Sequence, residues 1–170
     1  TADGKSLIVR AQRRPGFESD RWYLDVIDRA SNTKRTVFES PDLSVSEFVL
    51  SRDGRDILFT ASDRGTDNLY RVALAGGSPT LVTKGGAISA VNAGESSVIF
   101  SKASLNAPAE LFRVAVAGGA AQSLTHENKA WLDTVSLSTP ESATVPGAAR
   151  PRESCPAGCM AEVGLRWWRQ

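Results

Sequence analysis

An internal repeat constrains this chain more than any other feature of its sequence. Residues 69–77, LYRVALAGG, return as residues 111–119, LFRVAVAGG, at an offset of 42 residues. A looser copy precedes them, because residues 24–37 align with residues 69–82 at an offset of 45. Three copies in the same internal order predict a fold in which one structural unit is stacked on itself.

Each copy has the composition of short β-strands. Runs of β-branched and aromatic residues alternate with turn residues, and no stretch has helical periodicity with caps. Asp53-Gly54 predicts a tight hairpin turn, since glycine tolerates positive φ and aspartate bonds its own backbone. Gly76-Gly77 and Gly118-Gly119 predict turns between the third and fourth strands of a copy. The strands expected lie near residues 6–11, 21–27, 34–38, 44–50, 56–61, 68–74, 79–83, 87–92, 97–102, 110–116, 121–125 and 131–137.

Four strands in about 42 residues is the spacing of a β-propeller blade. The sequence therefore predicts an all-β fold, an incomplete β-propeller of about three four-stranded antiparallel blades with a short irregular C-terminal tail. The predicted domain covers residues 1–147, with repeats near 1–43, 44–86 and 87–130 and one extra strand near 131–137. Closed propellers use about four to eight blades, so we expect the chain to be a piece of a longer protein.

Residues 148–170 differ in composition from the repeats. They hold both cysteines, the single methionine and two of the four tryptophans. Such a shift favours a frameshifted, chimeric or disordered end, and a genuine short tail is the alternative. Cys155 and Cys159 have no histidine near them and give only a weak metal signal, so we interpret them as incidental. A disulfide between them would indicate an oxidising compartment.

Charge and hydropathy set limits on the partners of the chain. Its 20 Lys+Arg and 19 Asp+Glu leave a net charge of +1, which gives no reason to expect nucleic acid or an anionic membrane. No apolar run approaches the roughly 18–20 residues that span a bilayer. We therefore expect no nucleic acid and no membrane among its partners.

The repeat resembles that of a known group of propellers. The residues that carry the likeness are SRDGRDILF at 51–59, NLYRV at 68–72, Gly76-Gly77 and LVT at 81–83. They resemble the Ser-Pro-Asp-Gly-Lys repeat of TolB-type propellers, which also builds the N-terminal propeller of the prolyl oligopeptidase family of serine peptidases. That family includes dipeptidyl and acylaminoacyl peptidases. Residues 123–128 and 138–141 are similar to the exit from that propeller toward an α/β-hydrolase domain.

The resemblance implies a function for the complete protein. The chain would be the non-catalytic propeller fragment of a serine peptidase, and the complete propeller would admit only oligopeptides to the hydrolase domain. The implied partners are that α/β-hydrolase domain, which nothing after Gly147 resembles, and an oligopeptide substrate. The alternative is a TolB-like binding or scaffold module without attached catalysis. Bacterial relatives are often exported, which points to a periplasmic or secreted location.

We expect no catalytic site in the chain itself. It lacks a G-x-S-x-G nucleophile elbow, and its nearest stretch is Gly76-Gly77-Ser78. His126 is the only imidazole, and we interpret it as a loop residue, so no Ser-His-Asp triad can be assembled. The prediction is therefore no catalytic, cofactor-binding or metal-binding residue, no cofactor, and no peptidase activity for the isolated chain.

Two groups of residues remain as candidates for binding. Carboxylates such as Asp25, Asp28, Asp63 and Asp67 bind cations or substrate amines in some proteins, but turn capping is the preferred interpretation here. The second group lies in an insertion of the first copy, where three arginines alternate with aromatic residues: Arg13, Arg14, Phe17, Arg21, Trp22 and Tyr23. Stacking on nucleic-acid bases is one interpretation of that pattern. The neutral net charge favours a solvated loop or a contact to the hydrolase domain instead.

Overall fold

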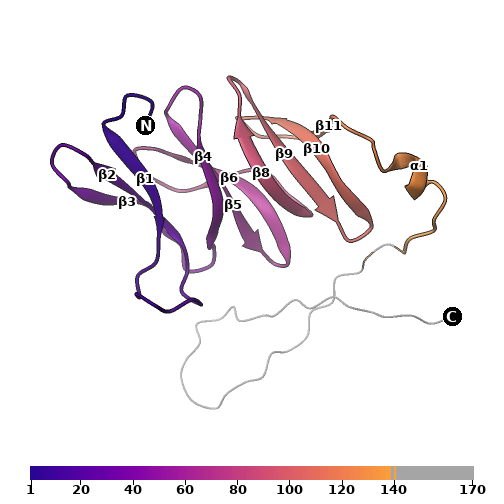
Figure 1. Ribbon diagram of the computed structural model, residues 1–170, viewed down its shortest axis with the longest axis horizontal. Coiled ribbons are helices and arrows are strands. Elements are labelled where there is room, and N and C mark those ends of the chain that lie inside the picture. The colour runs from indigo at the N-terminus through magenta and orange to yellow at the C-terminus, as the bar shows by residue number, and fades with distance from the viewer. Residues whose placement is uncertain (139, 141–170) are drawn as a thin grey trace, which may run out of the picture.

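Three antiparallel sheets, which we call blades one, two and three, stand side by side in chain order (Figure 1). The computed structural model describes residues 1–138 and 140. Blade one has the strand order β1-β2-β3, blade two β4-β5-β6-β7, and blade three β11-β10-β9-β8. The bounds are β1 Ser6–Ala11, β2 Tyr23–Asp28, β3 Lys34–Phe38, β4 Val45–Leu50, β5 Asp56–Asp63, β6 Thr66–Ala73, β7 Thr80–Thr83, β8 Ala87–Ala93, β9 Ser97–Ser104, β10 Ala107–Ala115 and β11 Gln122–Ser123.

The predicted fold class is confirmed. Eleven of the expected strands are present, with ends within three residues of those predicted. All neighbouring strands pair antiparallel, as the short hairpin connections require. The described residues therefore form an incomplete propeller of three blades.

The twelfth expected strand, over residues 131–137, is wrong. A short helix, α1 (Lys129–Leu132), begins there instead, and Lys129 forms an ion pair with Asp133 one turn later at 2.8 Å. A strand at this place would need a neighbour to complete its ladder of hydrogen bonds, and the described part of the chain offers none. No helix among the described residues is long and apolar enough to cross a membrane. The predicted tail, 148–170, with both cysteines, lies outside the described residues.

The predicted Asp-Gly turn connects β4 to β5. The Gly54 N–H donates to the Ser51 carbonyl at 2.9 Å, and the φ of Gly54 is +72°, a conformation that side chains with a Cβ rarely adopt. The Asp53 carboxylate accepts from the Ser51 hydroxyl at 2.7 Å and from the Arg55 N–H at 3.1 Å. The Ser51 bond, as the larger cause, and the Arg55 bond lower the pKa of Asp53.

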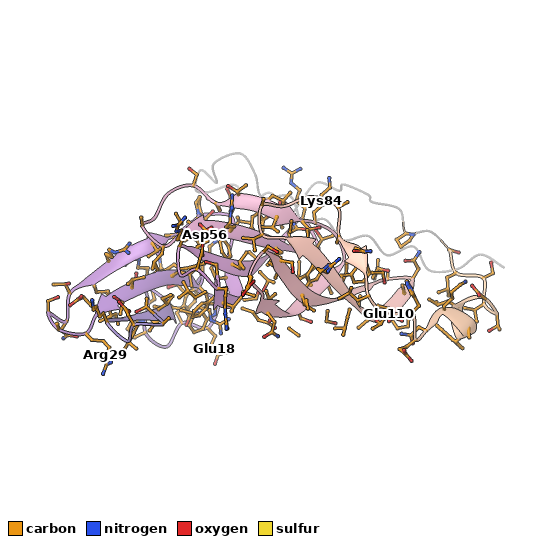
Figure 2. All side chains as sticks on the ribbon, turned by 90° about the horizontal axis from the view of Figure 1, so that it is seen from above. Glu18, Arg29, Asp56, Lys84 and Glu110 are labelled. Atoms are coloured by element: carbon orange, nitrogen blue, oxygen red, sulfur yellow. The ribbon has the colours of Figure 1, made fainter. Side chains whose placement is uncertain are left out.

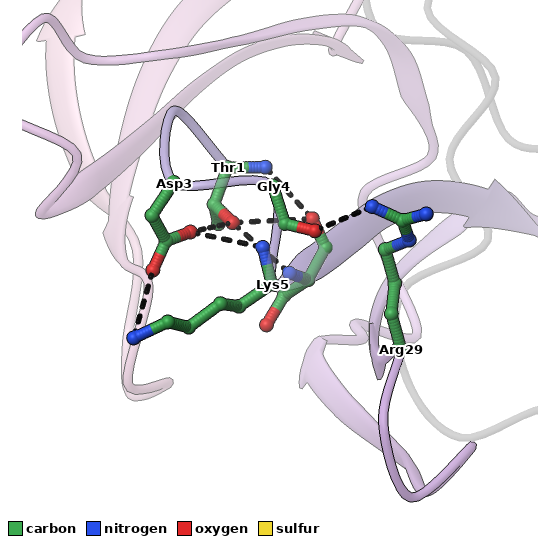
Figure 3. A network of polar contacts seen from close by, with 6 residues as sticks. Thr1, Asp3, Gly4, Lys5 and Arg29 are labelled. Carbon is green, nitrogen blue, oxygen red and sulfur yellow. Dashed lines mark hydrogen bonds and ion pairs between the residues drawn. The ribbon is translucent and has the colours of Figure 1, made fainter.

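The same turn recurs before β1 (Figure 3). The Gly4 N–H donates to the Thr1 carbonyl at 3.0 Å, and Asp3 accepts from the Thr1 hydroxyl at 2.6 Å and the Lys5 N–H at 3.1 Å. The Thr1 hydroxyl is the main reason that the pKa of Asp3 is lowered. Arg29, from the following hairpin, donates to the Gly4 carbonyl at 2.7 Å. A hydroxyl, an aspartate and a glycine at the same spacing thus form the turn before β1 in blade one and before β5 in blade two.

The hydrophobic core lies in two layers between the sheets, and Figure 2 draws its side chains together with all the others. Because side chains alternate along a strand, each blade has one set of residues facing the blade before it and another facing the blade after it. In β5, Ile57 and Phe59 pack toward blade one, whereas Leu58 packs toward blade three. Phe59 lies between Phe38 and Tyr70, with ring centroids 4.6 and 5.5 Å away. Blade two is therefore covered on both faces.

The Gly-Gly turns lie where the sequence predicts and also join neighbouring blades. The Gly76 N–H donates to Ala73 at 2.8 Å and closes the turn between β6 and β7. In the next copy, the Gly119 N–H reaches across to the Val82 carbonyl of blade two at 3.1 Å. Arg35 of blade one donates to the Leu74 carbonyl of blade two at 2.7 Å. These cross-blade bonds fix the spacing of the blades, and the sequence pattern did not predict them.

Candidate functional site

The insertion of the first copy forms a hydrogen-bonded loop between β1 and β2. The Asp20 carboxylate accepts from the Arg14 backbone N–H at 2.8 Å and from the Arg21 N–H at 3.0 Å. These bonds, with Arg14 the larger cause, lower the pKa of Asp20. The Gln12 amide donates to the Asp20 carbonyl at 2.7 Å. Asp20 thus holds both ends of the loop together.

Three arginine–aromatic stacks order the side chains of this loop. The guanidinium of Arg10 lies 4.3 Å from the centroid of the Trp22 ring, and that of Arg13 lies 4.1 Å from the Tyr23 ring. Arg14 lies over Phe17 at 5.5 Å. Such contacts are favourable because the ring face carries negative potential, and they leave guanidinium edges free to donate. The alternation of arginine and aromatic residues is therefore a structural feature of the loop.

A chain of polar contacts, the blade-one network, crosses the outer face of blade one, the face turned away from blade two. Its members, in order of contact, are Glu39, Arg13, Thr36, Asp25 and Lys34. Arg13 donates twice to Glu39, at 3.0 and 2.6 Å, and once to the Thr36 hydroxyl at 3.3 Å. The Thr36 hydroxyl donates to Asp25 at 2.8 Å, and the Lys34 ammonium lies 3.4 Å from the other Asp25 oxygen. The Arg13 hydrogen bonds lower the pKa of Glu39, and Glu39 in turn raises the pKa of Arg13.

Asp25 is the buried centre of the network. It lies in the middle of β2, fully inaccessible to solvent, so the turn-capping interpretation is wrong for this residue. Its Oδ2 atom has no hydrogen-bond partner among the described residues, although Lys34 is close enough for an ion pair. The ion pair is therefore Coulombic, without the hydrogen bonds that usually satisfy a buried carboxylate.

A cavity opens beside the network, at the base of the inserted loop. It has a volume of about 310 Å³ and is lined by Arg13, Arg21, Trp22, Tyr23 and Glu39, with Asp20, Ser40 and Pro41. Two guanidinium groups and two carboxylates line it, so its charges balance. Aromatic walls with both donors and acceptors suit a polar peptide segment better than a highly charged ligand.

The other predicted aspartates do not join this site. Asp28 caps the hairpin after β2, since it accepts from the Ala30 and Ser31 N–H groups at 3.1 and 2.8 Å. Asp67 accepts from the Ser62 hydroxyl across the β5–β6 pair, and Asp63 lies 3.9 Å from Arg64 at the tip of that hairpin. No group of His, Cys, Asp or Glu within the described ranges is arranged to hold a metal ion.

His126 lies in the segment that leaves blade three. Its side chain is exposed and its carbonyl accepts from the Lys129 N–H at 3.1 Å. The same segment is held by Glu110, which accepts from Thr125 and, at 2.8 Å, from the Asn128 N–H. The Thr125 hydroxyl and the Asn128 N–H lower the pKa of Glu110 to about 2. Gly76-Gly77-Ser78 lies in a hairpin, where no nucleophile elbow forms.

Sequence reasoning missed Lys34, Thr36 and Glu39. They join the site because β2 and β3 pair in a register that places Thr36 opposite Asp25 and Lys34 opposite Ile27. One signal was available in the repeats. The copies align Asp25 with Tyr70 and Phe112, two aromatic residues that contact the preceding blade. Asp25 places a carboxylate where the other two copies have an aromatic ring, which indicates that this face of the first blade differs from the others.

Comparisons with known proteins agree with the propeller architecture. No family model matches the chain. Dipeptidyl-peptidase 5 of Porphyromonas gingivalis is 34% identical over 132 residues, which is 77% of this chain and 19% of that protein. The chain thus spans about a fifth of the length of this curated relative.

Solved structures are similar in fold. The uncomplexed acylaminoacyl peptidase of Pyrococcus horikoshii superposes with a TM-score of 0.71 at 19% identity, covering 87% of this chain and 23% of that one. A TolB from Agrobacterium tumefaciens superposes with a TM-score of 0.61 at 20% identity, covering 72% of this chain and 46% of that one. At these identities the likeness concerns the arrangement of the blades alone.

Proposed function

We propose that the chain is the non-catalytic propeller portion of a serine peptidase, because it is an incomplete β-propeller of the prolyl oligopeptidase type. In this proposal the complete ring controls which oligopeptides reach a hydrolase domain. The observation that carries it is the 34% identity to dipeptidyl-peptidase 5 over 132 residues, a length that exceeds any single blade.

The physical properties of the blades support a gating role. Two buried core layers and the bonds from Gly119 and Arg35 hold the sheets at fixed spacing, so the blades form a rigid wall. We expect these blades to supply no bond-breaking group, because the sequence contains neither a G-x-S-x-G elbow nor the residues of a Ser-His-Asp triad around its single histidine. Selection by such a wall acts through exclusion of large or folded substrates.

The inserted loop is the part of the chain best suited to contact the hydrolase domain. Arg14 and Arg21 form no ion pair among the described residues, and Phe17 is 47% exposed. A surface of arginine and aromatic side chains is typical of protein interfaces, where both residue types are enriched. We assign the loop to that contact, with acidic and apolar groups as its counterpart.

A chimera tests the proposal. The matched segment of the Porphyromonas dipeptidyl-peptidase 5 is replaced by the corresponding residues of this chain, and hydrolysis is measured on a chromogenic dipeptide substrate and on a folded protein. We expect hydrolysis of the small substrate and none of the folded protein. Comparable cleavage of both by a folded chimera would show that these blades do not restrict access.

The isolated chain provides the control. We expect no hydrolysis of a chromogenic peptide ester, and activity that a serine-directed inhibitor abolishes would overturn the proposal.

A binding module without catalysis is the second candidate, favoured by the likeness to TolB. The DNA that follows the coding sequence distinguishes the two candidates. A G-x-S-x-G reading frame after the propeller supports the peptidase, and stop codons in all frames support the binding module.

A further inference from the structure

Another cavity, which we call the junction groove, lies between blades two and three. It has a volume of about 430 Å³ and is lined by residues 81–84 of blade two and by Lys102 and residues 119–121 of blade three. Its walls are β7 and the turn before β11, so it follows the edge strands of the two sheets. A further blade at either end of the row would be separated from the groove by at least one whole sheet.

The junction groove holds two lysines without a carboxylate partner. The chain has five lysines, and Lys5, Lys34 and Lys129 each lie within 4.0 Å of an aspartate oxygen. Within the described ranges, Lys84 and Lys102 form neither an ion pair nor a hydrogen bond through their ammonium groups. None of the described residues that line the groove is acidic. The groove therefore carries two positive charges that the surrounding protein does not balance.

The loop between β7 and β8 brings the two ammonium groups to one place. Lys84 begins this loop, and the Lys102 Nζ atom lies 4.0 Å from where a Cβ on Gly85 would be. The same Nζ atom is 5.4 Å from the centroid of the Phe112 ring, whose face attracts a cation. The Gly85 N–H donates to the Asn68 side-chain carbonyl at 2.9 Å, which holds the loop in position. The groove is thus ordered before any ligand binds, and this lowers the entropic cost of binding.

The repeat indicates that packing of the blades does not require these lysines. Lys102 aligns with Ala61 of blade two at an offset of 41, and Lys84 aligns with Glu39 of blade one at an offset of 45. The junction between blades one and two therefore has an alanine and a glutamate at the equivalent positions. Ala61 is fully buried there, so a small side chain is sufficient to pack one blade on the next. The lysine pair is a property of one junction and not of the fold.

We propose that the junction groove binds an acidic, extended segment of a partner protein. Ammonium groups form charge-assisted hydrogen bonds with carboxylates, and Lys84 and Lys102 provide two such sites. Leu81, which is 45% exposed, lines the groove together with Ala120 and Ala121, and this apolar surface is one that a small inorganic anion would leave uncovered. A segment that alternates acidic and apolar side chains matches both features. The inference rests on the groove and not on the proposed function.

Titration of the full chain with the peptide acetyl-Glu-Leu-Glu-Leu-Glu-amide, followed by NMR of the backbone amides, tests the proposal. We expect the largest shifts at residues 81–85 and 119–121, and a dissociation constant of roughly 0.5 mM at low salt, because ion pairs that water reaches are weak. The affinity should fall as salt is added, since exposed charges are screened. The same peptide with glutamine in place of glutamate should bind at least tenfold more weakly.

Three variants, each of which removes one positive charge, locate the binding site. Lys102→Met should weaken binding of the glutamate peptide at least fivefold and Lys84→Met at least twofold. Lys5→Met is the matched control, because Lys5 is exposed in the turn before β1, and it should leave the affinity unchanged. Urea midpoints confirm that the variants fold, and Lys84→Met, at an exposed position, decides the test if Lys102→Met does not fold.

Several outcomes would overturn the proposal. An absence of shifts at about 5 mM peptide would show that the groove does not bind such a segment. Equal weakening by Lys5→Met and Lys102→Met would indicate non-specific attraction to the net charge. Equal affinity for the glutamine peptide would show that the lysines do not recognise carboxylates. Inorganic phosphate that binds the groove as tightly as the peptide would assign it to a small anion instead.

Discussion

The ion pair between Asp25 and Lys34 gives the sharpest test of the blade-one network. Lys34→Met removes the ammonium that lies 3.4 Å from the buried carboxylate while it keeps the length of the side chain. Breaking a fully buried pair lowers the free energy of unfolding by about 3–5 kcal/mol. Because Lys34 is 55% exposed, its own solvation offsets part of that loss, and we expect about 2 kcal/mol.

The coupling energy between Asp25 and Lys34 distinguishes the contribution of their charges to stability from the contribution of side-chain packing. Asp25→Asn keeps an oxygen for the Thr36 hydroxyl but removes the charge. In that background Lys34→Met should lower the free energy of unfolding by no more than about 0.5 kcal/mol, which gives a coupling of about 1.5 kcal/mol. Lys84→Met is the control, since Lys84 is exposed and forms no ion pair among the described residues.

Urea unfolding followed by tryptophan fluorescence is measured for the wild type, the two single variants, the double variant and the Lys84→Met control. The linear dependence of stability on urea gives the free energy of each variant, and unchanged slopes show that the unfolding transition is the same. A coupling below about 0.3 kcal/mol would refute the reasoning, because Asp25 would then be buried without depending on Lys34. The reasoning would also be refuted if Lys84→Met lowered the free energy of unfolding as much as Lys34→Met does.

Two further predictions concern the turns and the exit from blade three. Gly86→Ala should lower the free energy of unfolding by about 3 kcal/mol, because the added Cβ would lie 2.2 Å from the Ala103 carbonyl oxygen. Gly65 has the same φ of +79° but no atom within 4 Å of an added Cβ, so Gly65→Ala should lower the free energy of unfolding by only about 1 kcal/mol. Equal urea midpoints for the two variants would contradict this prediction. The pKa of Glu110 in the folded chain is about 2, below its ordinary value of 4.5. The ionised Glu110 carboxylate therefore contributes its full stabilisation of the fold above pH 4.5, and this contribution is lost as the pH falls toward 2. Glu110→Gln should therefore reduce the acid-induced fall in the urea midpoint, and an unchanged pH profile would contradict the assignment.

The strands were predictable because their signals are local. Alternating side chains and turn residues such as Asp53 and Gly54 act within a few positions, so each hairpin could be placed within three residues. The strand expected at 131–137 failed for the opposite reason. A strand is stable only when another strand supplies its hydrogen bonds, and that requirement cannot be read from the segment itself. With no neighbour among the described residues, Lys129–Leu132 follows its helix propensity.

The candidate site was only partly predictable. The arginine and aromatic residues of the insertion were found because they are close in sequence, but Glu39 is 26 positions from Arg13 and joins it through folding. Asp25 was interpreted as a turn residue because aspartate is frequent in turns. Its burial depends on Thr36 and Lys34, which β3 brings alongside β2. Only the alignment of the copies contained a signal for it.

One position in the repeat explains why the two ends of the row of blades differ. Where blades two and three place Tyr70 and Phe112 against the preceding sheet, blade one places a carboxylate that is held by Thr36 and Lys34. An aromatic ring gains free energy when a sheet covers it, whereas the blade-one network loses hydration without gaining partners. The outer face of blade one therefore favours a neighbour with polar groups over a purely apolar sheet.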